Sequence, residues 1–268
     1  MTEAIFPVVF PGPPGKPPDG PDELAAAARQ SLALLSVLPG RVGAVLAGIA
    51  YRAAAGAPYA DGAAPSVVLA GLPGCGKTTC GTAALSHFSP ETRTRSGWRD
   101  VGAESSPGGP GRRLVMVDVP ALDHSVLMTG DGGQGGPEAM EALTVSLALG
   151  EVTADRRAAL VAPEARQGRA ALGASFSAWL AGKDQDRLAA RKTSLAARFA
   201  GEWRDEGHSP PAARMLAEMS AGWALMLGHL EHAGACLPPE SRQLWQQARA
   251  GLHEAGLADA ALAAGGVR

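Results

Sequence analysis

The sequence is poor in aromatic residues, in lysine and in cysteine. Aromatic side chains make up 4% of the 268 residues, so a hydrophobic core has to be built from alanine and aliphatic side chains, which lets helices pack closely. The three cysteines, Cys75, Cys80 and Cys236, are too few and too scattered for a disulfide framework or a zinc site. This cysteine usage is typical of a cytoplasmic protein.

Long apolar runs and an excess of one charge are also missing. No apolar stretch approaches the roughly 18 residues needed to span a bilayer, and residues 1–10 lack the basic and apolar regions of a signal peptide. We therefore predict a soluble protein with no membrane partner. A net charge of −2 and an isoelectric point near 6.3 argue against nucleic-acid binding over the whole chain.

One stretch fits a phosphate-binding loop. Residues 66–88 read SVVLAGLPGCGKTTCGTAALSHF, which is an apolar run typical of a buried parallel strand, then a glycine-rich loop, then a helical pattern. The loop matches G-x-x-x-x-G-K-[ST] in full, and because the chain has only four lysines a chance match is rare. The predicted nucleotide-binding residues are Gly71, Gly74, Cys75, Gly76, Lys77, Thr78 and Thr79.

Each residue type in this loop has a task in binding a polyphosphate. Glycines let the backbone curl with its N–H groups inward and leave room for a phosphate. The Lys77 ammonium would contact the β- and γ-phosphates, and the Thr78 hydroxyl would ligate Mg²⁺. The positive end of the following helix adds to the attraction. The motif therefore predicts nucleotide binding with Mg²⁺.

A second apolar run ends in a carboxylate. Residues 112–118 read RRLVMVD, which has the Walker B form, so Asp118 is the second predicted metal residue beside Thr78. A third apolar run lies at 126–129, and only residues 119–125 separate it from Asp118. A crossover between parallel strands needs about a dozen residues or more. These two strands are therefore antiparallel, or the second is irregular, or the sheet is abbreviated.

The chain divides into three predicted parts. Residues 7–21 are dense in proline, which predicts a disordered tail over 1–21. A nucleotide-binding domain is predicted over 22–150, and it includes two helical patterns that precede the loop. From Thr153 the pattern is helical throughout, which predicts an all-helical domain over 151–268.

Within these parts, several segments have a predicted structure of their own. The two helical patterns cover 23–38 and 42–54, with Asp22 as the cap of the first. A long surface loop is expected over 89–111, and residues 143–149 alternate like an edge strand.

Basic and histidine side chains of the C-terminal part give weaker signals. Arg187, Arg191 and Arg198 could share one helix face, but neighbouring acidic residues offset them, so a solvated face is predicted. The histidines show no metal-ligand spacing with a third partner, and they are predicted to be surface or packing residues. They are His208, His229, His232 and His253.

The order of these segments resembles a known family. The series LSVLPGRVGAVLAGIAYRAAAG, SVVLAGLPGCGKTT, RRLVMVDVP, VLMTGD and LTVSLALGEV, together with the helical tail, looks like the ATPase domain called domain of unknown function nine-two-seven over residues 32–256. That family occurs in helicase-like or primase-associated replication proteins of plasmids, integrative elements and phages. The resemblance implies an abbreviated α/β P-loop NTPase fold of the RecA or AAA type with a parallel-sheet core, and ATP, Mg²⁺ and DNA as ligands. It also implies catalytic roles for Lys77, Asp118 and Thr129, the last as a polar sensor.

Three departures from the family pattern bear on catalysis. The segment between the Walker B and sensor strands is almost absent, Val119 stands where a second acidic residue is usual, and no lysine or arginine occurs over 114–155. Hydrolysis needs a group that orients water and a cation that stabilises the transition state. Asp123 could replace the carboxylate, and Arg156, Arg157 or an arginine of a neighbouring subunit could supply the cation.

The leading hypothesis is an ATP-binding, helicase-like P-loop protein of mobile-element DNA replication that hydrolyses ATP weakly if at all. Its partners would be single-stranded DNA or replication proteins, and it could form a homo-oligomer. The alternative is a non-catalytic module that binds a nucleotide or a partner. A small-molecule kinase is a third reading, and the arginine-poor stretch after Asp118 counts against it.

Overall fold

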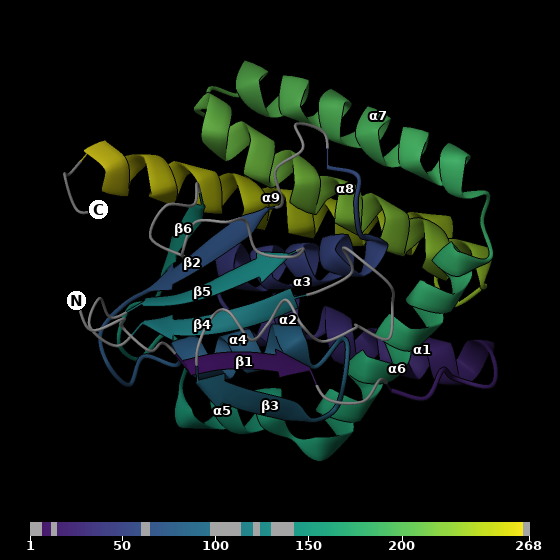
Figure 1. Cartoon of the computed structure of the whole chain (residues 1–268), viewed down its shortest axis with the longest axis horizontal. Coiled ribbons are helices and arrows are strands. Elements are labelled where there is room, and N and C mark those ends of the chain that lie inside the picture. Colours follow the sequence, from purple (N-terminus) through teal and green to yellow (C-terminus); the bar gives the residue numbers. More distant parts are fainter. Residues whose placement is uncertain are drawn as a thin grey trace.

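The protein is an α/β structure in which the described helices lie behind one sheet and beyond its β6 edge, as seen in Figure 1. The computed structural model describes residues 7–11, 15–59, 65–96, 114–119, 124–129 and 142–264. None of the described helices is both long and apolar enough to cross a membrane.

The sheet has six described strands in the order β3-β1-β4-β5-β2-β6. Their bounds are Pro7–Pro11 (β1), Ser66–Ala70 (β2), Thr92–Ser96 (β3), Leu114–Val119 (β4), His124–Thr129 (β5) and Leu143–Ser146 (β6). Among these strands only β2 and β6 pair in parallel, and every other neighbouring pair is antiparallel. The predicted parallel sheet is therefore limited to one pair of described strands. For β4 and β5 the reason is that the chain between them is too short for the crossover that parallel strands need. The edge strand expected at 143–149 is confirmed over Leu143–Ser146 as β6, which lies at one edge of the described sheet.

Two strands lie where none was predicted. β1 occupies part of the predicted disordered tail and pairs on both sides, with β3 and β4. Its prolines, Pro7 and Pro11, stand at the two ends of the strand, so residues 8–10 keep the N–H groups that a ladder needs. β3 falls within the predicted long loop over 89–111. Both strands depend on partners distant in the sequence, which no local pattern reveals.

The helices begin and end close to the predicted positions. The first helical pattern is split into α1 (Pro21–Leu32) and α2 (Leu34–Val37), with Gly20 rather than Asp22 as the cap. In the C-terminal part, the helix bounds agree with the prediction because proline begins helices, serine caps them and glycine ends them. Ser209 is an example, since its side chain accepts a hydrogen bond from the Ala212 N–H at the start of α8. The other helices are α3 (Gly40–Ala55), α4 (Lys77–Leu85), α5 (Ala154–Val161), α6 (Pro163–Ala181), α7 (Gln185–Asp205), α8 (Pro210–His232) and α9 (Pro238–Ala264).

Helix α3 lies at the centre of the protein, between the sheet and helices α8 and α9 (Figure 1). From Val42 onward every residue of α3 is buried, and most are alanine, glycine or valine. A Cβ at Gly222 of α8 would lie 2.7 Å from the Arg52 backbone nitrogen, so the backbones of α3 and α8 are in close contact. This agrees with the close helix packing predicted for a core with few aromatic side chains. One hydrophobic core joins α3 to α8 and α9, and the predicted boundary at residue 150 does not divide it.

A charged pair is buried where α3 meets α8. Arg52 donates from Nε to Glu218 Oε2 at 2.5 Å, and its other nitrogens donate to the carbonyl oxygens of Gly56 and Pro58 at 2.5 and 2.6 Å. Lys192 of α7 adds a second buried cation, whose Nζ donates to the Ala55 carbonyl at 3.0 Å. These cations satisfy carbonyls at the end of α3, where an unpaired oxygen would be costly.

A buried histidine links α4 to the N-terminal helices. His87 Nδ1 lies 3.0 Å from the Ala84 carbonyl oxygen and Nε2 lies 2.7 Å from Ser31 Oγ, which in turn lies 2.5 Å from the Tyr51 hydroxyl. A neutral ring fits this chain, with Nδ1–H donating to Ala84 and Nε2 accepting from Ser31. Burial, followed by the charge of Arg169, lowers the pKa of His87 to about 3.

We expect this histidine to make the protein acid-sensitive. Because the unfolded chain takes up the proton below pH 6.5 and the folded chain does so only near pH 3, stability falls as the pH drops through this window. The slope from His87 is about 1.4 kcal/mol per pH unit. Urea unfolding at pH 6 and pH 5 should show that the wild type loses about this much more than His87→Gln. Equal losses in the two proteins would contradict the assignment.

Candidate functional site

The predicted phosphate-binding loop connects β2 directly to α4. Gly71, Gly74 and Gly76 have φ angles of 150°, 81° and 104°, a region that residues with a side chain rarely adopt. Lys77 is the first residue of α4, and Gly76 is its left-handed cap. A backbone of this kind that opens into a helix N-terminus is the usual form of an anion-binding concavity.

The segment that follows β6 forms a wall beside this loop. The Leu147 N–H donates to the Ala70 carbonyl at 2.8 Å. A Cβ on Gly71 would lie 2.4 Å from the Leu147 carbonyl oxygen, and one on Gly76 would lie 3.2 Å from Val152 Cβ. Gly71 is therefore required both by its φ angle and by this close approach.

The side chains of the loop differ in exposure. The half-buried Lys77 folds back over the loop, and its Nζ donates to the carbonyl oxygens of Gly71 at 2.5 Å and Leu72 at 3.2 Å. Thr78 is exposed and Thr79 is half-buried. Cys75 and Cys80 are buried, and burial raises the pKa of Cys80 to about 12, so this thiol is a packing group rather than a nucleophile.

The strand register places Asp118 at the same end of the sheet as the loop. Asp118 pairs with Ser125 of β5, and Ser125 pairs with Leu69, one residue before the end of β2. β5 lies between β4 and β2, so the two backbones are about 10 Å apart. The carboxylate was expected on the adjoining strand, and it is instead one strand further away. The side chain of Asp118, and Asp123 altogether, lie outside the described part of the chain.

Thr129 lies at the opposite end of the sheet from the loop. Met128 pairs with Ser66 at the start of β2, and Thr129 pairs with Leu114 at the start of β4. The length of β2 separates this end from the loop by about 13 Å. The predicted sensor position required a strand parallel to β2, whereas β5 runs antiparallel to it. The structure therefore does not bring Thr129 together with Lys77.

Arginine side chains lie on the wall beside the loop. Arg156 and Arg157, in the first turn of α5, donate to the carbonyl oxygens of Glu151 at 2.8 Å and Val152 at 3.0 Å. Arg41 of α3 donates from Nη2 to both oxygens of Glu151, at 2.6 and 2.7 Å. The pair of Arg41 and Glu151 fixes the turn after β6, and nothing in the local sequence signals it.

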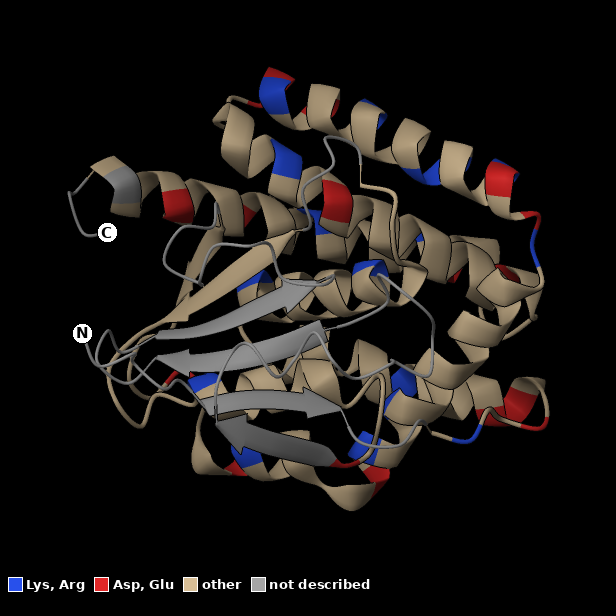
Figure 2. Ribbon diagram, in the orientation of Figure 1, with Lys and Arg blue, Asp and Glu red and all other residues tan. Residues whose placement is uncertain are grey.

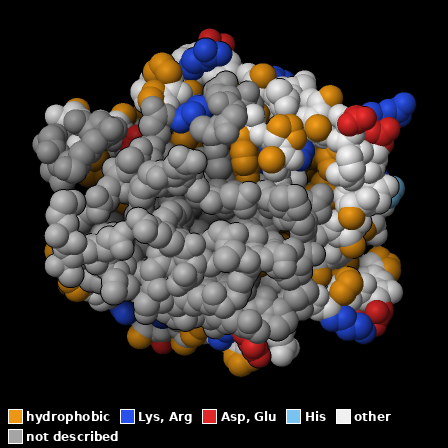
Figure 3. Space-filling model, in the orientation of Figure 1, with side chains coloured by type: hydrophobic (Ala, Val, Ile, Leu, Met, Phe, Trp, Pro, Cys, Tyr) orange, Lys and Arg blue, Asp and Glu red, His pale blue; other side chains and the backbone are white. Residues whose placement is uncertain are grey.

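The arginines of α7 form a solvated face, as predicted. Arg187 lies 3.7 Å from Asp184 and Arg198 lies 3.5 Å from Glu202, and all four side chains are exposed. Figure 2 shows charges of both signs along this helix. In the face drawn in Figure 3, the described charged side chains also stand in mixed groups.

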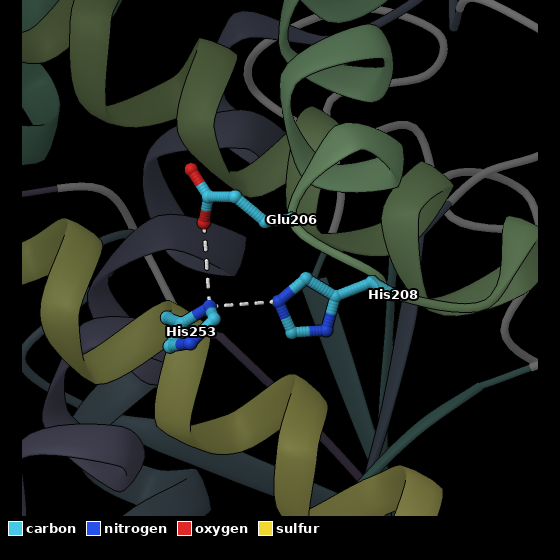
Figure 4. Close-up of side chains that lie close together, drawn as sticks. All are labelled: Glu206, His208 and His253. Carbon is cyan, nitrogen blue, oxygen red and sulfur yellow. Dashed lines mark hydrogen bonds and ion pairs between the residues drawn. The ribbon is translucent and has the colours of Figure 1, made fainter.

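Three side chains lie together in the structure: His208, His253 and Glu206, a residue that the sequence did not single out (Figure 4). His208 Nε2 is 2.9 Å from His253 Nδ1, and His253 Nδ1 is 3.3 Å from Glu206 Oε2. Burial and then the neighbouring His253 lower the pKa of His208. For His208 and His253 the prediction that they lack a third partner is wrong, because Glu206 lies beside them. The sequence does not reveal this cluster, since the two histidines are 45 residues apart and come together only through the packing of α9.

No protein-family model, curated protein or solved structure matches the chain. The resemblance to the nine-two-seven family is therefore carried by the sequence motifs alone. Function has to be inferred from the loop, the strand ends and the side-chain clusters of this chain.

Proposed function

We propose that the chain is a P-loop protein that binds ATP with Mg²⁺ at residues 71–79, and that it belongs to the helicase-like proteins of mobile-element DNA replication. The observation that carries the proposal is the backbone of the loop. Gly71, Gly74 and Gly76 have positive φ, and Gly76 directly precedes Lys77, the first residue of α4. The loop follows the end of the mostly buried strand β2. This arrangement favours a polyphosphate over a neutral ligand.

The side chains of the loop suit the parts of a magnesium nucleotide. The Lys77 ammonium lies over the loop and would exchange its carbonyl acceptors at Gly71 and Leu72 for phosphate oxygens. The exposed Thr78 hydroxyl would hold the metal, which in turn neutralises phosphate charge. Asp118 belongs to the same end of the sheet, where a carboxylate could orient water around that metal.

Binding is better supported than turnover. The residue expected to sense the γ-phosphate, Thr129, stands at the far end of β5. A non-catalytic nucleotide-binding module is therefore the second candidate function. A steady-state ATPase assay with and without single-stranded DNA separates the two, with Lys77→Ala as the baseline. Turnover above that baseline favours the motor, and binding of Mg-ATP without turnover favours the module.

We expect Asp118→Asn to weaken nucleotide binding only when Mg²⁺ is present. Loss of one charge-assisted contact should raise the dissociation constant of Mg-ATP about 10-fold to 100-fold and leave that of metal-free ATP unchanged. Calorimetry of the full chain with Mg²⁺ or with a chelator measures both values. Asp155→Asn, which removes an exposed carboxylate of α5, is the matched control. An equal loss in both buffers would count against a metal role, and the absence of Mg-ATP binding in the wild type would overturn the proposed function.

A further inference from the structure

The cluster of Glu206, His208 and His253 is assembled from two separate segments of the chain (Figure 4). Glu206 caps the end of α7, His208 follows it in the short connection to α8, and His253 projects from the middle of α9. One donor atom from each residue lies within 4.8 Å of the other two. The cluster lies outside the phosphate-binding loop and has no part in the proposed nucleotide function.

Two of the three separations between donor atoms are close to those of a metal site, and the third is within 4.8 Å. Zinc binds histidine nitrogen at about 2.0–2.1 Å and carboxylate oxygen at about 2.0–2.2 Å, so two ligands of a tetrahedral ion lie about 3.3 Å apart. The observed separations are 2.9 Å between the two imidazole nitrogens and 3.3 Å between His253 Nδ1 and Glu206 Oε2. An ion between them would need only small side-chain adjustments.

The neighbouring residues hold these side chains in place. The ring of His253 stacks on Trp203 with an interplanar angle of 18°, and the ring of His208 meets the same indole edge-on at 75°. Gly256 makes room for His208, because a Cβ there would lie 2.6 Å from the imidazole. Arg249 binds Glu206 through Oε1, which leaves Oε2 directed at His253. Such outer contacts are what orient the ligands of a metal.

The cluster is partly exposed to solvent. His208 is buried, whereas the side chains of Glu206 and His253 are 35% and 39% exposed. An ion could enter from the Glu206 side and keep a water ligand there. Two histidines and one glutamate with an open position is a donor set that zinc uses in proteins.

We propose that Glu206, His208 and His253 form a binding site for one divalent cation of the zinc class. The bound ion would join the end of α7 to α9 through three protein ligands and would complete its coordination with water. Nitrogen ligands favour zinc over magnesium or calcium, which prefer oxygen.

The test is calorimetric titration of the full, chelator-treated and nucleotide-free chain with zinc chloride. The wild type should bind one zinc ion per chain. Loss of an outer partner of a metal site costs about 10-fold to 100-fold in affinity, so His253→Gln and Glu206→Gln, which remove ligands, should each cost at least about 100-fold. Zinc at about 100 times its dissociation constant should raise the melting temperature of the wild type by roughly 5 °C and leave that of His253→Gln unchanged.

Two controls keep the result decisive. His232→Gln removes an exposed histidine outside the cluster and should bind zinc as the wild type does. Melting in chelator shows whether each variant is folded, and if His253→Gln is not, Glu206→Gln decides the question. No stoichiometric zinc binding in the wild type, or equal affinity in all four proteins, would overturn the proposal and leave the cluster as a hydrogen-bonded packing contact.

Discussion

Glu218→Ala is expected to lower the free energy of unfolding by about 3–5 kcal/mol. The reason is the buried position of its partner, Arg52, which is fully inaccessible to solvent at the contact of α3 and α8. Without the carboxylate, the guanidinium keeps its bonds to the carbonyls of Gly56 and Pro58 and its position over the Tyr59 ring, but its charge remains in the core without the opposite charge of Glu218. Urea unfolding at neutral pH measures the loss.

A surface ion pair serves as the matched control. Glu202 contacts Arg249 at 3.1 Å, but its side chain is 39% exposed, so Glu202→Ala should cost no more than about 1 kcal/mol. Replacing both buried partners, Arg52→Met with Glu218→Leu, should cost less than Glu218→Ala, because the double variant leaves no buried guanidinium without its carboxylate. Similar losses for Glu202→Ala and Glu218→Ala would show that the buried pair does not stabilise the fold.

The sequence predicts those parts of this fold that local chemistry determines. Helix ends follow proline, serine and glycine, as where Gly207 follows α7 and Ser209 caps α8. The positive φ angles of Gly71 and Gly76 also follow from the loop motif, since its spacing requires glycine at these two positions. Both features lie within a few neighbouring residues.

The parts that could not be predicted depend on contacts between distant residues. β1 was missed because its pairing with β3 and β4 outweighs the proline content around it. Thr129 does not lie near the loop because β5 runs antiparallel to β2. The family pattern implies parallel strands, and the direction of a strand depends on its pairing within the sheet. The charged pair of Arg52 and Glu218 and the histidine cluster lie on helices whose packing no periodicity encodes.

Lys77→Ala is expected to weaken ATP binding at least about 100-fold, since several charge-assisted hydrogen bonds to phosphate are lost together. The fold should be retained, because the ammonium bonds to the carbonyls of Gly71 and Leu72 and to Cys75 Sγ, all within the half-exposed loop. Calorimetry with Mg-ATP and thermal melting of the same sample measure both effects. The melting temperature should stay within about 2 °C of the wild type.

The control variant is Lys16→Ala, which removes an exposed lysine paired with Asp19. It should change neither the affinity for Mg-ATP nor the melting temperature. Binding that survives in Lys77→Ala would place the nucleotide elsewhere, whereas a joint loss of binding and stability would mean that the lysine supports the loop itself. Zinc titration of Lys77→Ala adds an independent check, because the cluster of Glu206, His208 and His253 contains no residue of the loop. A variant that loses ATP and keeps zinc is folded, and its defect is then confined to the phosphate-binding loop.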